Sequence, residues 1–81
     1  MTGQQRAART VARANQRAHE RWQAYPVAVD GLVDVWLQNG EYVSGVALRS
    51  APFQRDGQWL VTVAGMGDHM LERVRAHVVL A

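Results

Sequence analysis

The chain has 81 residues, of which 48% are hydrophobic and 20% are charged, and its formal net charge is +2. This length corresponds to one small domain and leaves little volume for a deep enzyme cleft. The absence of cysteine excludes disulfides and thiolate metal sites, and no apolar run reaches the ~20 residues that a membrane-spanning helix needs.

Residues 4–23 predict an N-terminal helix, because helix formers dominate this stretch and Pro26 ends it. One face of the helix carries an apolar stripe made of Ala7, Val11, Ala14, Ala18, Trp22 and Tyr25. The adjacent face carries a cationic stripe made of Arg6, Arg9, Arg13, Arg17 and Arg21. We expect the apolar stripe to dock on the rest of the protein and the cationic stripe to meet an anion.

The charges are unevenly distributed along the chain. Residues 1–25 contain five arginines and one glutamate, whereas residues 26–81 contain four arginines and six acidic residues. A basic helix beside a mildly acidic body fits anion binding, and it equally fits contacts between copies of the protein. The chain has no lysine and no isoleucine, as is typical of a GC-rich genome, so the use of arginine alone does not indicate phosphate chemistry.

After Pro26 the apolar period changes to two, which indicates short strands. We expect five of them, at residues 33–37, 42–50, 58–63, 70–74 and 78–80. Asn39-Gly40 is the clearest hairpin signal, with both residues expected at positive φ. Gly45 is a predicted bulge, residues 55–57 and 65–68 are predicted turns, and residues 75–77 are a predicted one-turn break.

Residues 33–48 read VDVWLQNGEYVSGVAL and resemble the first signature segment of Sm-like proteins. That segment alternates apolar residues up to a leucine, turns at Asn-Gly or Asp-Gly, and reaches a glycine five residues later. Residues 73–80 match the family's second segment more loosely, with Ala76 where glycine is usual. The loop at residues 50–54 lacks the Asp and Asn with which the family holds a base.

The predicted elements indicate an α+β, mostly β fold, and the resemblance agrees with it: a basic helix at residues 1–25 and a five-stranded SH3-like or Sm-like small barrel at residues 26–81. The two parts are expected to form one compact domain. The alternative fold is a sandwich in which the helix covers one sheet face. Because Sm-like proteins form rings that bind RNA, the resemblance also implies RNA binding and oligomerisation.

Trp36, Arg75 and His77 are further candidate contact residues. Trp36 shares a strand face with Asp34 and would stack on a base if exposed, whereas helix coverage of that face would pack it on Trp22. The valine-rich strand around Trp59 predicts a core position for that tryptophan. The three histidines are scattered, which predicts no metal site, and no catalytic constellation or cofactor motif stands out.

The sequence therefore favours a non-enzymatic nucleic-acid-binding protein, with RNA or DNA held by the arginine stripe together with Arg75, His77 and Trp36. The alternative is an assembly or adaptor protein that forms homo-oligomers or larger assemblies, of the kind encoded by phages or mobile elements of GC-rich hosts. We expect no membrane partner, and a cytoplasmic location or one inside a virion assembled in the cytoplasm.

Overall fold

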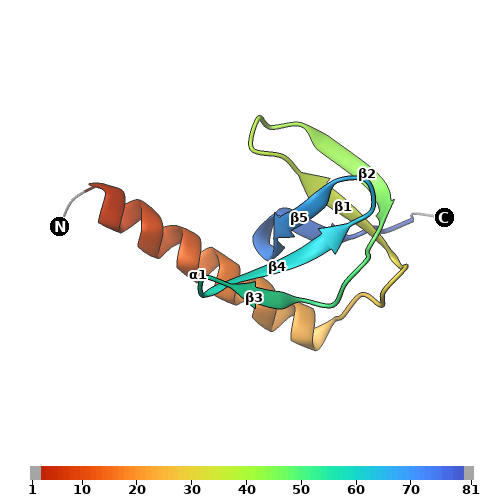
Figure 1. Ribbon diagram of the computed structural model, residues 1–81, viewed down its shortest axis with the longest axis horizontal. Coiled ribbons are helices and arrows are strands. Elements are labelled where there is room, and N and C mark those ends of the chain that lie inside the picture. Colours follow the sequence, from red (N-terminus) through yellow and green to blue (C-terminus); the bar gives the residue numbers. More distant parts are fainter. Residues whose placement is uncertain (1–2, 80–81) are drawn as a thin grey trace.

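The computed structural model describes the backbone of residues 3–79 and the side chains of residues 12–79. Helix α1 (Gly3–Ala24) is followed by six short strands and one 3₁₀ turn, η1 (Leu71–Arg73). The strands are β1 (Leu32–Trp36), β2 (Tyr42–Ala47), β3 (Phe53–Arg55), β4 (Gln58–Val63), β5 (Gly67–Met70) and β6 (Val74–Ala76). The molecule is thus α+β and mostly β, as the sequence indicates (Figure 1). Among the described residues, no helix is long and apolar enough to cross a membrane.

The strands form two antiparallel sheets of three strands each, in the orders β2-β1-β6 and β3-β4-β5. An isolated bridge between Leu48 and Val63 links the two sheets. Their inner faces enclose a core to which α1 contributes Ala18 and Trp22. Helix α1 packs mainly on η1 and β4, and its N-terminal part extends beyond the sheets (Figure 1).

This arrangement corrects the expected five-stranded Sm-like or SH3-like barrel. Six strands lie in two separate sheets, and no barrel is closed within residues 3–79. Three of the strands have only three or four residues, and η1 interrupts the chain between β5 and β6. Between the two sheets there is an isolated bridge, Leu48 to Val63, and no ladder, so strand pairing within the described residues does not continue around a closed cylinder. The resemblance at residues 33–48 therefore reflects a bulged hairpin and not a barrel.

Several boundary predictions were wrong. The one-turn break falls at Leu71–Arg73 instead of residues 75–77, so it interrupts the strand predicted at residues 70–74 and separates β5 from β6. Strand β6 (Val74–Ala76) lies where the break was predicted, and residues 78 and 79 of the last predicted strand are not in a strand. Residue 80 lies outside the described residues. Strand β3 was missed, because three residues carry no detectable alternation. It forms only because the turn at Asp56 and Gly57, both at positive φ, pairs it with β4.

The hairpin between β1 and β2 is where Asn39-Gly40 predicts it, but its turn is of a different type. Gly40 has φ +87°, whereas the φ angle of Asn39 is not positive. The Gly40 N–H donates to the Leu37 carbonyl, and the Asn39 side chain accepts a hydrogen bond from the Glu41 N–H. Asn39 therefore stabilises the turn by accepting a hydrogen bond with its side chain, and it does not adopt the left-handed backbone conformation.

The core face of α1 differs from the predicted apolar stripe at two residues, Tyr25 and Asn15. Ala18 and Trp22 are buried as expected, but Tyr25 lies past the end of the helix and is 84% exposed. Asn15, which is only 2% exposed, belongs to the buried face instead. Its side-chain amide bonds to the backbone of Trp59 on β4, while the Trp59 ring stacks on His19. The side chains of Ala7 and Val11 lie outside the described residues.

Candidate functional site

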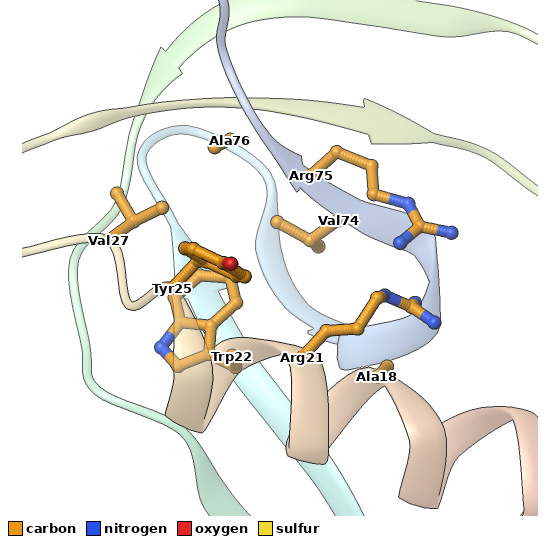
Figure 2. A pocket seen from close by; sticks show the side chains of 8 residues that line it. All are labelled: Ala18, Arg21, Trp22, Tyr25, Val27, Val74, Arg75 and Ala76. Carbon is orange, nitrogen blue, oxygen red and sulfur yellow. The ribbon is translucent and has the colours of Figure 1, made fainter.

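A pocket of about 170 Å³ lies between the C-terminal end of α1 and strand β6. Its lining is apolar except for two arginines and one tyrosine: Ala18, Arg21, Trp22, Tyr25, Val27, Val74, Arg75 and Ala76. Arg21 projects from α1 and Arg75 from β6, and their guanidinium groups lie on the same side of the pocket (Figure 2). The fold thus brings together two cations that are 54 residues apart in the sequence.

The arginines of this pocket repel each other. Partial burial lowers the pKa of the Arg21 guanidinium, and the nearby positive charges of Arg75 and Arg17 lower it further. Arginine still remains protonated at neutral pH. Among residues 12–79, the acidic side chains that form ion pairs do so with Arg49, Arg55 and His77, and not with Arg21 or Arg75. A bound anion would relieve this repulsion.

A second pocket, of about 330 Å³, shares Arg75 with the first. Trp36, Glu72 and Arg73 complete its lining. Glu72 is the one acidic residue in the lining of either pocket, and it makes no ion pair within the described side chains. The two pockets adjoin at Arg75, and we call their charged and aromatic lining the arginine–aromatic face, whose residues are Arg21, Tyr25, Trp36, Arg73 and Arg75.

Trp36 is 41% exposed and lies on the outer face of sheet β2-β1-β6. Val33 and Val35 point into the core, so alternation along β1 directs Asp34 and Trp36 to the opposite face. The ring of Trp36 contacts that of Tyr42, at 4.7 Å between centroids and 57° between planes. The expected packing of Trp36 on Trp22 is therefore wrong, because Trp22 belongs to the core on the other side of the sheet.

The carboxylate of Asp34 organises this outer face. Residues Ser44 and Gly45 form a bulge opposite Asp34, as the shift in register between Val33 and Val35 indicates. The bulge lies at Gly45, where the sequence predicts it, and Gly45 has φ +72°. In this conformation the Gly45 N–H donates a hydrogen bond to Asp34 Oδ1 at 2.9 Å. Tyr42 Oη donates to Asp34 Oδ2 at 2.6 Å.

Two more groups complete the shell around Asp34. Ser44 Oγ donates to Asp34 Oδ1 at 3.0 Å, and His77 Nδ1 lies 2.8 Å from the same oxygen. Burial raises the pKa of the Asp34 carboxyl, but hydrogen bonds from Tyr42, Gly45, His77 and Ser44 outweigh it and lower the pKa to about 2. Asp34 is therefore a buried anion at neutral pH that fixes the positions of four neighbours.

Ser44, His77 and Asp34 are the residue types of a serine-hydrolase triad, but their geometry differs from that of a triad. A triad needs the serine hydroxyl on one imidazole nitrogen and the carboxylate on the other. Here Ser44 Oγ and Asp34 Oδ1 both face Nδ1, at 3.3 and 2.8 Å. The cluster is suited to hold the end of β6 against β1 and not to activate a nucleophile.

The other candidate residues from the sequence are distributed as follows. Arg13 and Arg17 are exposed on α1, on the side of the helix that leads to Arg21. The side chains of Arg6 and Arg9 lie outside the described residues. His77 is tied to Asp34, whereas Arg75 lines both pockets.

Sequence reasoning missed two residues of the arginine–aromatic face, Tyr25 and Arg73. It also missed the three residues Asp34, Tyr42 and Ser44 of the hydrogen-bonded shell. The sequence does contain a signal for the shell around Asp34, because this acidic residue lies between two valines of a predicted strand and opposite Gly45, a glycine expected to form a bulge. Within residues 12–79, no group of three potential metal ligands comes together.

No protein-family model matches this chain, and comparisons with curated proteins and with solved structures found no significant match.

Proposed function

We propose that the protein is a non-enzymatic nucleic-acid-binding module and that its arginine–aromatic face contacts the phosphate backbone. The observation that supports this proposal is the pairing of Arg21 with Arg75 across the first pocket without an acidic partner among residues 12–79. Guanidinium groups form bidentate hydrogen bonds with phosphate oxygens. Arg17 and Arg13 extend the same positive surface along α1.

The distribution of ion pairs favours this face over the rest of the surface. Arg49 pairs with Asp30 and Arg55 pairs with Asp68, so these two cations already have partners. Arg21 and Arg75 instead combine positive charge with neighbouring aromatic rings. Clustered positive charge steers polyanions to a surface and binds them through release of their counterions.

The test is fluorescence anisotropy with labelled RNA and DNA oligonucleotides at about 50 mM salt, where phosphate contacts are strong. We expect binding by the native protein and loss of binding by the Arg17→Glu/Arg21→Glu variant with unchanged circular dichroism. Arg49→Glu is the control, because it reverses an exposed charge that lines neither pocket. Absence of binding to any of these oligonucleotides would contradict the proposal.

A second candidate function is assembly, as a homo-oligomer or as an adaptor within a larger particle. It is favoured by the backbone of the N-terminal part of α1, which extends beyond the sheets and would offer a surface to another chain (Figure 1). Light scattering during size-exclusion chromatography, with and without nuclease treatment, separates the two candidates. A nuclease-resistant oligomer supports assembly, whereas absorbance at 260 nm that nuclease removes supports nucleic-acid binding.

A further inference from the structure

We infer that the arginine–aromatic face binds single-stranded nucleic acid in preference to a duplex. This inference rests on the proposed function and names the class of its ligand. Arg75 lies between two sites that each contain an exposed aromatic ring, Tyr25 in the first pocket and Trp36 in the second. A strand that crosses the face would place a phosphate on Arg75 and its neighbouring bases on the two rings.

Two exposed aromatic rings lie among the arginines of this face. Tyr25 is 84% exposed and Trp36 is 41% exposed, although each has apolar surface that folding normally buries. Both belong to the same face as the arginines without acidic partners. Single-strand-binding proteins combine these two features, a positive groove for the backbone and aromatic rings on which unpaired bases stack.

The Trp36 ring is held in place before any ligand arrives. Tyr42 Oη is fixed by its 2.6 Å hydrogen bond to the buried Asp34 carboxylate, and the Tyr42 ring in turn contacts Trp36. A ring that is already oriented loses little side-chain freedom on binding, which favours affinity. The Asp34 shell thus gives the face a fixed stacking platform.

A duplex cannot use this platform in the same way. Its bases are already stacked and paired, and unstacking them costs a few kcal/mol per step. Only the phosphates of a duplex would reach Arg21, Arg73 and Arg75. The structure thus favours an unpaired strand over a paired one of the same charge density, and stacking is tolerant of sequence because every base has a π face.

The experiment compares a 20-nucleotide oligo(dT), an oligo(U) of the same length and a 20-base-pair DNA duplex by anisotropy at equal salt. We expect both single strands to bind more tightly than the duplex. Trp36→Leu should weaken single-strand binding about fivefold or more, while Trp36→Phe should restore most of it. Duplex binding should change less than twofold in both variants.

Tryptophan fluorescence gives an independent readout. Trp22 is buried and Trp59 is covered by His19, so Trp36 is the tryptophan that an added strand reaches. Oligo(dT) should quench the fluorescence of the native protein and not that of Trp36→Phe. A duplex that binds as tightly as the single strands, with Trp36→Leu neutral for both, would overturn this inference and leave the proposed function intact. Failure of all three probes to bind would overturn both.

Discussion

The side-chain amide of Asn15 on α1 forms two hydrogen bonds with the peptide groups of Trp59 on β4. Asn15 Nδ2 donates to the Trp59 carbonyl at 2.9 Å, and the Trp59 N–H donates to Asn15 Oδ1 at 2.7 Å. Strand β5 ends at Met70, which pairs with Leu60, so Trp59 has no strand partner on that side. Asn15 therefore takes the place of a strand residue and anchors the helix that carries Arg17 and Arg21.

Replacing this anchor should destabilise the fold. We expect Asn15→Leu to lower the free energy of unfolding by about 1–3 kcal/mol, because the partly buried N–H and carbonyl of Trp59 lose their partners. Urea denaturation followed by circular dichroism measures this change. Gln16→Leu is the matched control, since Gln16 is exposed on the same helix. Equal stabilities of the two variants would contradict the anchoring role of Asn15.

The Asp34 shell predicts a specific pH dependence of stability. The pKa of Asp34 is about 2 in the folded state and 3.8 ordinarily, so the ionised form stabilises the fold above about pH 4. This contribution is lost as the pH falls toward 2. Asp34→Asn should therefore be less stable than the native protein at pH 5, and the difference between them should shrink by pH 2.

Urea denaturation at several pH values measures that difference. Asp56→Asn serves as the control, because Asp56 is exposed in a turn and accepts no side-chain hydrogen bond within the described part of the chain. The difference in free energy of unfolding between Asp34→Asn and the native protein should shrink from pH 5 to pH 2. A difference that stays constant over this range would rule out the proposed role of the carboxylate.

The bulge at Gly45 predicts a cost for any side chain there. At φ +72° an alanine is strained by about 1–2 kcal/mol. An added Cβ would meet its nearest neighbour, His77 Cε1, at 3.8 Å, which is an ordinary contact, so the strain comes from the backbone alone. Thermal unfolding should rank the variants Gly45→Asn, Gly45→Ala and Gly45→Val in order of falling stability. Equal stability of Gly45→Val and the native protein would show that the backbone relaxes.

Removing the charge of Glu72 should strengthen nucleic-acid binding, whereas the substitutions of Arg21 and Trp36 should weaken it. Glu72 lines the second pocket with Arg73 and Arg75, so its carboxylate repels a bound phosphate. Glu72→Gln should raise the affinity for oligo(dT) severalfold at low salt, and the gain should fade as salt screens the charge. Anisotropy titrations at two salt concentrations test this. A loss of affinity would mean that Glu72 itself orients the arginines.

The sequence predicts the local elements of this molecule better than their assembly. Alternating valines correctly identify β1 and β4, and Pro26 correctly marks the end of α1. The order of strands and the isolated bridge that links the two sheets depend on tertiary contacts, which leave no periodic signal in the sequence.

The sequence names some residues of the candidate site but does not predict how they come together, because that also depends on tertiary contacts. Arg21, Arg75 and Trp36 were proposed from charge and residue type. Arg75 comes near Arg21 only when β6 lies beside α1, and near Trp36 only when β6 pairs with β1. Asn15 reads as an exposed polar residue in a helical pattern, and its burial depends on the unpaired edge of β4. Asp34 likewise reads as the polar half of an alternating strand until the Gly45 bulge surrounds it with donors.

The central claim, that Arg21 and Arg75 hold phosphates, is tested most directly by the salt dependence of oligo(dT) binding. Each phosphate contact on a single strand contributes about 0.7 to the slope of log K against log salt concentration. The Arg21→Gln/Arg75→Gln variant should therefore have a slope smaller by about 1.4 than that of the native protein. Arg49→Gln should leave the slope unchanged. Equal slopes for the double variant and the native protein would contradict the claim.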